Sequence, residues 1–267
     1  MSDDEANEFV GYSDEKLPNV RVVEDGDVRI KIQAFFKYKH SAAVVEYTIP
    51  KKGTYVDVEI LMYSNEPNKM IKYTLDTKLN GIPYGETAFG YEELSNDETE
   101  AVYHKWCGLK DGDKNLYVVN RGIYGGSFTN STIKLSLLRT PIYAAHPIGE
   151  RQIAPHDRFV KHIDMGERNF SFRITTEPNI AREAQVYNEK PQLMSFFPSG
   201  DGVRNSGVIS VDNPDVILSS LKKQNGKYRL NLFNATNAEK DAEILFLKDN
   251  KKIKLHFAKH EIKQIEV

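Results

Sequence analysis

The sequence contains a single cysteine, Cys107, among its 267 residues. No internal disulfide can therefore form, which favours a reducing compartment. An excess of basic charge is also missing, because 36 lysines and arginines stand against 38 acidic residues, whereas nucleic-acid binding relies on a positive surface. No apolar run approaches the roughly 20 residues needed to span a bilayer. Residues 1–8 are acidic and polar, unlike a signal peptide, and we expect a solvated start. These absences predict a cytoplasmic protein that binds neither nucleic acid nor membrane.

What the sequence does have is alternation of apolar and polar residues. Residues 28–34 and 56–62 show it most regularly, as expected for strands with one face in a core and one in water. Further strands are expected at residues 41–49, 69–75, 115–120, 132–139 and 169–175. Only residues 179–187 favour a helix, with Asn179 as its N-cap. The pattern predicts an all-β protein built from antiparallel sheets packed as sandwiches.

A second β-rich region begins near residue 207. Its short strands are expected at residues 215–220, 226–233, 242–247, 251–257 and 261–267. The segment before it holds Pro198-Ser199-Gly200-Asp201-Gly202, a composition typical of a connector. We therefore predict three parts: a larger β-region at 1–190, a connector at 191–206 and a small β-sandwich at 207–267.

Five short motifs follow one another between Asn65 and Ile174. They are Asn65-Glu66 with Lys69-Met70-Ile71-Lys72, Pro83-Tyr84-Gly85, His104-Lys105-Trp106, Leu135-Ser136-Leu137-Leu138-Arg139, and Asp164-Met165-Gly166-Glu167 with Phe170-Ser171-Phe172. Their order and spacing resemble the β-rich C-terminal region of the family 38 glycoside hydrolases, the α-mannosidases. Arg168 departs from the pattern, because a histidine is usual at that position.

The resemblance implies a mutarotase-like β-supersandwich, incomplete at its N-terminal edge, followed by a small β-sandwich. It also implies a place in a retaining, zinc-dependent hydrolase of α-mannosides. Such enzymes carry their nucleophile, acid/base and zinc ligands in an N-terminal α/β barrel, and no part of this sequence resembles that barrel. We therefore expect no catalytic residue and no metal ligand here, zinc only in the catalytic barrel, and no activity from this chain alone.

The glycine-rich stretch Asn120-Arg121-Gly122 and Tyr124-Gly125-Gly126 is the candidate substrate-binding loop. Arginine is a bidentate donor suited to vicinal hydroxyls or a carboxylate. In the resembled family a loop from the β-region can reach over the barrel and line the sugar pocket. Asn120, Arg121 and Tyr124 are therefore our candidates for contact with a mannoside. The more common alternative is a surface turn whose glycines permit positive φ.

Three other features have a simpler structural reading. His162 and Asp164 form an H-x-D pair, the pattern with which the zinc site of the resembled family begins, but no third ligand follows at a recognised spacing, so a turn is simpler. Trp106, with nearby tyrosines, could stack on a sugar ring, although core packing is more frequent for a lone tryptophan. Cys107 has no base beside it in sequence, which favours a buried, unreactive thiol.

Two functions fit these observations. The first is the non-catalytic C-terminal part of an α-mannosidase, with the catalytic barrel and a mannoside as partners. The second is a stand-alone carbohydrate-binding or interaction β-sandwich without catalysis. A large exposed apolar face near residues 1–23 would favour the first function, and a closed surface with an aromatic groove the second. Association into homo-oligomers is left open by the sequence.

Overall fold

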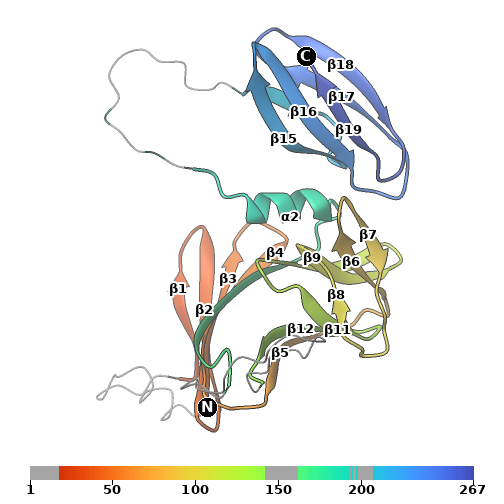
Figure 1. Ribbon diagram of the computed structural model, residues 1–267. Helices are drawn as coiled ribbons and strands as arrows, with labels where there is room; N and C mark the ends of the chain where they lie inside the picture. Colours follow the sequence, from red (N-terminus) through yellow and green to blue (C-terminus); the bar gives the residue numbers. More distant parts are fainter. Residues whose placement is uncertain (1–17, 142–161, 193, 195–196, 198–206) are drawn as a thin grey trace, which may run out of the picture.

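Nearly all of the regular secondary structure in the described chain is β-strand. The computed structural model describes residues 18–141, 162–192, 194, 197 and 207–267 (Figure 1). Every strand pairing in these ranges is antiparallel, which confirms the predicted all-β class. No helix within them is long and apolar enough to cross a membrane.

Two sheets make up the first part of the chain. The larger has nine strands in the order β1-β2-β3-β4-β13-β10-β9-β6-β7. Their bounds are Val20–Asp25 (β1), Arg29–Tyr38 (β2), Ser41–Pro50 (β3), Tyr55–Ser64 (β4), Gly166–Thr175 (β13), Lys114–Asn120 (β10), Trp106–Asp111 (β9), Ile82–Thr87 (β6) and Gly90–Glu93 (β7). The smaller sheet has the order β5-β12-β11-β8. Its bounds are Met70–Asp76 (β5), Thr132–Arg139 (β12), Gly125–Phe128 (β11) and Ala101–Val102 (β8).

The alternation of the sequence places the core between these two sheets. On β4, Val58 and Ile60 are buried while Glu59 between them is exposed, because successive side chains of a strand point to opposite faces. The central buried side chains from both sheets include Val58, Ile60, Leu109, Val118, Phe128, Ile133, Leu135 and Phe172. A sandwich with one apolar core results.

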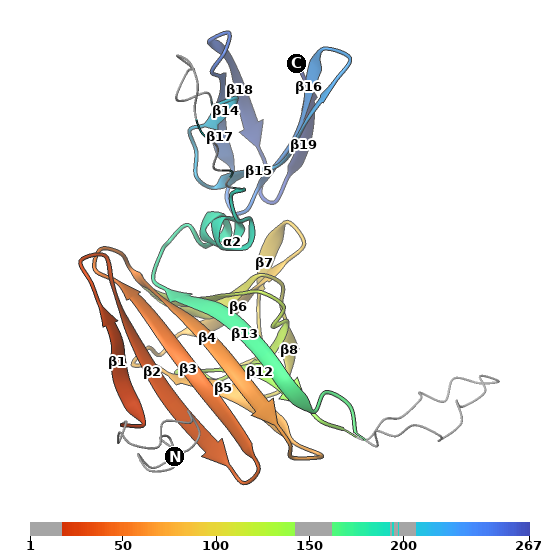
Figure 2. The same ribbon diagram turned by 90° about the vertical axis from the view of Figure 1, so that its left-hand side faces the viewer.

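The C-terminal part is a smaller pair of sheets with its own core. One sheet has the order β14-β17-β18 and the other β15-β16-β19, and Figure 2 shows them facing each other. Their bounds are Ile209–Val211 (β14), Val216–Gln224 (β15), Lys227–Asn234 (β16), Lys240–Phe246 (β17), Lys251–Phe257 (β18) and Ile262–Glu266 (β19). Leu230, Leu232, Ile244 and Phe257 are fully buried between them.

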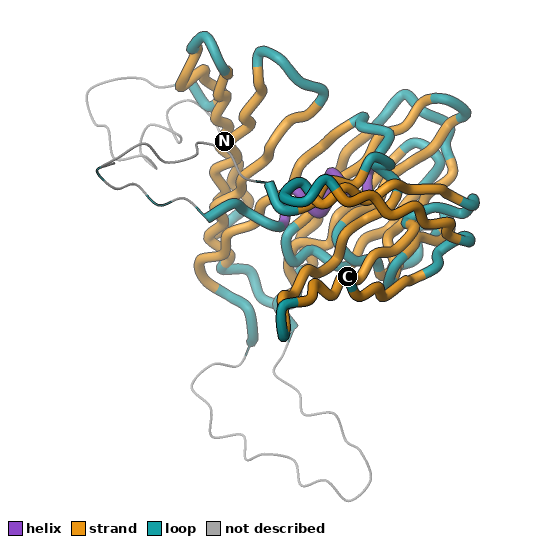
Figure 3. The backbone as a smooth tube through the Cα atoms, turned by 90° about the horizontal axis from the view of Figure 1, so that it is seen from above, coloured by secondary structure: helices purple, strands orange, loops and turns teal. Residues whose placement is uncertain are grey.

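Helix α2 (Ile180–Asn188) lies between the two parts. Its Ile180, Ala184 and Tyr187 pack against a cluster that contains Trp106 and Tyr117 of the nine-stranded sheet. A neighbouring side of the helix carries Ala181, which packs against Ile217, Phe233 and Ala235 of the C-terminal part. Seen from above, the helix (purple) lies under the C-terminal strands (Figure 3). The helix therefore contributes to two hydrophobic clusters at once.

The predicted strands are present, with differences at their ends, and the structure adds, within the described residues, seven strands that were not predicted: β1, β6, β7, β8, β9, β11 and β14. The helix predicted at 179–187 is present, and Asn179 is its N-cap residue, although its side chain caps no amide. The strand predicted at 169–175 begins earlier, at Gly166, because residues 166–168 continue the pairing with β4. Most of the predicted connector 191–206 lies outside the described residues, so the limits of the three parts stay a prediction.

Removal of the Phe172 ring should destabilise the larger part strongly. Phe172 is fully buried and its ring centroid lies 4.8 Å from that of Tyr73 on the opposite sheet. We expect Phe172→Ala to lower the free energy of unfolding by about 3–5 kcal/mol, because a cavity is left in a packed core. The same substitution at the exposed Phe197 should change it by less than about 0.5 kcal/mol. Urea unfolding measures both, and equal effects would contradict the assigned core.

Candidate functional site

The candidate loop connects β10 to β11, and Asn120 closes it. Asn120 is buried, and its side-chain amide Nδ2 donates to the carbonyl oxygen of His104 at 2.9 Å. Its Oδ1 accepts the backbone N–H of Ile123 at 2.9 Å. Gly122 has a φ of +89°, a conformation that favours glycine. The amide of Asn120 is thus used to fix the shape of the loop.

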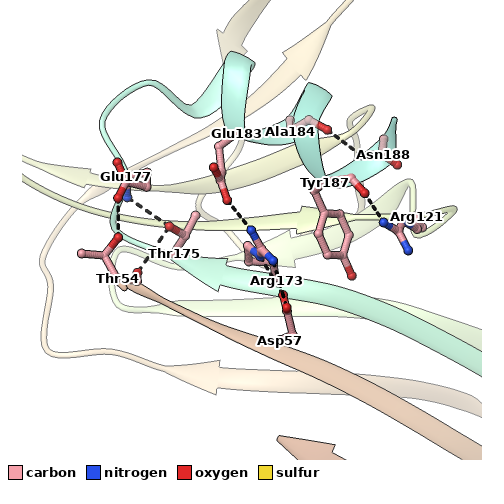
Figure 4. A network of polar contacts seen from close by, with 10 residues as sticks. All are labelled: Thr54, Asp57, Arg121, Arg173, Thr175, Glu177, Glu183, Ala184, Tyr187 and Asn188. Carbon is pink, nitrogen blue, oxygen red and sulfur yellow. Dashed lines mark hydrogen bonds and ion pairs between the residues drawn. The ribbon is translucent and has the colours of Figure 1, made fainter. Parts of the chain in front are cut away.

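Arg121 is directed towards α2. Its guanidinium donates from Nη2 to the backbone carbonyl of Tyr187, and its Cζ lies 4.2 Å from the centroid of the Tyr187 ring (Figure 4). A cation over an aromatic face and a hydrogen bond to the last turn of a helix are both stabilising contacts. The half-buried Arg121 therefore ties the loop to the helix.

Tyr124 differs from its two neighbours in the loop, because its side chain is 57% exposed. Its backbone carbonyl accepts the N–H of Tyr103 at 3.2 Å, which holds the main chain. Val102, also exposed, belongs to β8 and pairs with Gly125, the residue that follows Tyr124. Of the three candidates, Tyr124 is the one whose side chain is most accessible to a ligand.

Sequence reasoning missed the ion-pair network around Arg173. This residue forms a bidentate pair with Asp57, from Nε at 2.6 Å and Nη2 at 2.9 Å, and its Nη1 bonds Glu183 of α2 at 2.6 Å (Figure 4). Its Cζ also lies 3.6 Å from the centroid of the Tyr55 ring. Burial alone would lower the pKa of Arg173, but the hydrogen bonds to the two carboxylates outweigh it and raise the pKa.

The network fixes α2 on the nine-stranded sheet. Arg173 and Asp57 stand opposite each other in the β13–β4 register, on the face away from the core. Glu183 then reaches down from the first turn of α2. From the sequence, the network could be suspected only because a charged residue, Arg173, lies between Phe172 and Ile174 on one predicted strand and Asp57 lies on another. This placement becomes informative only when the two strands are known to pair.

The aromatic and thiol candidates are buried. Trp106 is 1% exposed, with its ring 5.4 Å from that of Tyr117 and 5.8 Å from that of Tyr91. A ring enclosed in this way cannot stack on a sugar. Cys107 is fully buried, and this burial raises its pKa to about 12, against a smaller opposing hydrogen bond from Tyr103. A thiol in that state is not a nucleophile at neutral pH.

His162 and Asp164 lie at a turn. Asp164 has a φ of +60°, and Gly166 two residues later has a φ of +100°, just where β13 begins. Asp164 is half-exposed and its Oδ1 lies 3.5 Å from Nη2 of Arg168, the residue at the family's usual histidine position. Among the described residues, no group of three or more His, Cys, Asp and Glu side chains is placed to hold a metal ion.

Loss of the Arg173 guanidinium should weaken the attachment of α2. We expect Arg173→Ala to lower the free energy of unfolding by about 2–3 kcal/mol, because Asp57 and Glu183 are left partly buried without their partner. The control is Arg182→Ala, on the exposed side of the same helix, which should cost less than about 0.5 kcal/mol. Chemical denaturation compares the two variants. A similar loss of unfolding free energy in both variants would show that the ion-pair network does not stabilise the attachment of α2.

Comparisons with known proteins identify the family. The model of the glycosyl hydrolases family 38 C-terminal domain matches residues 3–147, more than half of the chain. A comparison with curated proteins found no match.

Two solved structures have the same fold. One is an α-mannosidase from Enterococcus faecalis V583, with a TM-score of 0.73 and 11% identity over 92% of this chain and 34% of that chain. The other is a protein in glycosyl hydrolase family 38 from Enterococcus faecalis, with the same TM-score, identity and coverage of this chain, and 36% of its own length covered. The chain thus spans about a third of the length of these structures. It belongs to glycosyl hydrolase family 38, whose C-terminal domain it contains.

Proposed function

We propose that this chain is the non-catalytic C-terminal part of a retaining, zinc-dependent α-mannosidase and supports the catalytic barrel of that enzyme. The observation that carries the proposal is the combination of family and coverage. The match to the family's C-terminal domain comes with a fold shared over 92% of this chain but only 34% of a solved α-mannosidase. The nucleophile, the acid/base and the zinc ligands would then belong to the remaining two-thirds.

The exposed apolar surface near the start of the described chain supports this function over a stand-alone sandwich. Val20 and Val22 on β1 are 57% and 61% exposed, and Phe36 on β2 is 52% exposed. Continuous apolar surface of this kind is typical of a protein–protein contact. A self-sufficient sugar-binding module would instead present an aromatic groove with convergent polar groups. The surface therefore favours a domain that is completed by a partner.

Within the assembled enzyme, we propose that the loop from Asn120 to Gly126 forms part of the sugar-pocket wall. Tyr124 would contact the mannoside, because its side chain is exposed. Arg121 and Asn120 would hold Tyr124 in place, the first through Tyr187 and the second through the backbone at residues 104 and 123. The remaining guanidinium N–H groups of Arg121 could reach a hydroxyl group at the same wall. A cytoplasmic location is part of this proposal, since the single cysteine suits a reducing compartment.

The isolated chain should show no mannosidase activity. We expect purified chain to release no chromophore from an aryl α-mannoside, with or without added zinc, and to retain less than one zinc per chain after dialysis. The reason is that hydrolysis requires two carboxylates about 5 Å apart around the sugar in a retaining enzyme. Turnover together with stoichiometric zinc would overturn the proposal. An adjoining coding sequence for a catalytic barrel in the genomic DNA would support it.

In the enzyme assembled with its catalytic barrel, Tyr124→Ala should lower kcat/KM for an α-mannoside about tenfold, because a contact of about 1.4 kcal/mol corresponds to that factor. Its thermal midpoint should stay unchanged, since the ring is exposed. Tyr63→Ala, on the outer face of β4, is the matched control and should leave kcat/KM unaltered. Equal kinetics for both variants would remove Tyr124 from the pocket wall.

A further inference from the structure

The nine-stranded sheet is wider than the sheet that covers it. In Figure 1, β5, β12, β11 and β8 lie to the right of β1 and β2. β5 is an edge strand of the covering sheet, so no described strand of that sheet extends beyond it. The inner face of β1 and β2 therefore extends beyond the described strands of the covering sheet, whereas the inner face of β3 packs in part against β5, with Val45 buried in the main core.

That inner face is apolar. Directly paired residues share a face of a sheet, so the register assigns Ile32, Ala34 and Phe36 of β2 to the same face as their partners Tyr47, Val45 and Ala43 of β3. Val20 and Val22 of β1 extend this face, because they pair with Ala34 and Ile32. Phe36 and Tyr38 at its end are 52% and 56% exposed. The apolar side chains of Val20, Val22 and Phe36 are thus left largely in water, whereas Ala34 and Val45 on the same face are buried.

The outer face of the same strands is more polar, although it also carries Phe35, which is buried with the Arg21 guanidinium over its ring. Arg21 of β1 donates to Gln33 of β2, at 2.7 Å from Nη2, and Lys31 of β2 pairs with Glu46 of β3. A sheet with one polar face and one apolar face is built to be solvated on one side and covered on the other. The exposed apolar side is therefore an incomplete core.

A groove runs between this inner face and β5. Its volume is about 700 Å³. Phe36, Tyr38, Ala43 and Val45 line it from the nine-stranded sheet, and Ile71 and Tyr73 line it from β5. Apolar and aromatic residues make up most of its lining, which also includes Lys37, Ser41, Glu66, Lys69, Lys72 and Thr74. Glu66 is buried and accepts the N–H of His40 at 2.9 Å. Apolar side chains would fill such a groove better than a sugar would.

The edge of β5 that borders this groove has hydrogen-bonding groups to offer. The N–H of Thr140 donates to the carbonyl oxygen of Lys69, and the N–H of Thr77 donates to the carbonyl oxygen of Ser131. The backbone N–H and C=O groups of odd-numbered residues around β5 therefore face β12. Because an antiparallel ladder alternates, the N–H and C=O groups of Lys72 and Thr74 point away from β12. In the described part of the chain, no strand pairs with this side of β5.

Edge and groove together specify the shape of the missing piece. A strand added beside β5 would lie about 4.8 Å from it and about 10 Å from the facing sheet, the spacings of a sandwich. Its backbone would form hydrogen bonds with the N–H and C=O groups of Lys72 and Thr74, and every second side chain would enter the groove. Strand addition to an exposed edge is a common mode of protein recognition.

The free edge of β1 is a poorer site. A strand added there would cover none of the apolar face, and the pairing of β1 has an irregularity between Val22 and Glu24. Bulges and charged residues are the usual protection of a sheet edge. A second copy pairing antiparallel, edge to edge, at β5 is also a poorer occupant, because the nine-stranded sheets of both copies would lie on the same side of the joined sheet and overlap.

We propose that β5 accepts an antiparallel β-strand from the catalytic part of the same enzyme. Alternate apolar side chains of that strand fill the groove over β2 and β3, and its backbone bonds Lys72 and Thr74. The source of the strand rests on the proposed function. The geometry of the edge and the groove does not.

The test uses the whole chain and a synthetic strand. The probe is an acetylated eight-residue peptide in which valine alternates with glutamate. We expect saturating peptide to slow amide hydrogen exchange of Lys72 and Thr74 at least tenfold and to leave Val20 on the edge of β1 unchanged. The control peptide has the same composition with the valines and glutamates in two blocks, and it should have no effect.

Two changes separate strand addition from unspecific adhesion. Thr74→Pro removes an N–H that faces the free edge, and it should abolish the protection, whereas Val20→Pro at the edge of β1 should preserve it. Circular dichroism checks that both variants are folded. If Thr74→Pro does not fold, a peptide with N-methyl groups on alternate residues serves instead, because it lacks one hydrogen-bonding edge and should not bind.

Each other outcome overturns the proposal. If the alternating peptide does not slow the exchange of Lys72 and Thr74, β5 is not a strand-binding edge. If the peptide protects the β5 amides only after deletion of residues 1–17, the chain's own N-terminal segment is the occupant. If the β5 amides are protected without peptide at high protein concentration, a second copy is the occupant. In the complete enzyme, active turnover with unprotected β5 amides would refute this inference while the proposed function stands. Peptide binding by a chain that proves catalytic alone would overturn the proposed function, and with it the source of the strand, although β5 would still be a strand-binding edge.

Discussion

The antiparallel pairing of β4 with β13 is the contact on which most of this structure depends. It continues from Gly166 opposite Ser64 to Thr175 opposite Tyr55, between segments 116 positions apart at Arg173 and Asp57. One face of the pair buries Val58 and Phe172 in the main core. The other face carries the Arg173–Asp57 pair, which extends to Glu183. Closing so long a loop costs conformational entropy, and the two faces together offset that cost.

Through this pairing, the first part of the chain is connected to the second. Helix α2 follows β13 after a short link, and Arg121 and Arg173 both contact Tyr187 on the helix. A neighbouring side of α2 packs against the C-terminal sheets, where Gln185 donates to the carbonyl of Leu218 at 3.0 Å. The candidate loop and the small sandwich are therefore both held by direct contacts with α2. A wall loop held in this way would be pre-organised for a ligand, and pre-organisation reduces the entropy lost on binding.

Many strands could be predicted from sequence, and the role of particular side chains could not. Alternation in residues 56–62 is a local property, because each side chain's face follows from its position in the strand. The loop at Asn120 was also recognisable from its glycines. Its arginine looked like a ligand-binding group, yet the structure places a helix carbonyl and the Tyr187 ring against it. That contact spans 66 positions, and no local pattern encodes it.

The sequence by itself determined the all-β class, the positions of many strands along the chain and the family, since alternation and ordered motifs are both read along the chain. Only the tertiary structure decided which polar groups are already paired, which aromatic rings are enclosed and which face is left uncovered. Trp106 and Phe36 both lie in strands, but one is buried under α2 and the other is half-exposed. The difference arises because the covering sheet ends at β5, so burial depends on what packs above a residue and not on its own pattern.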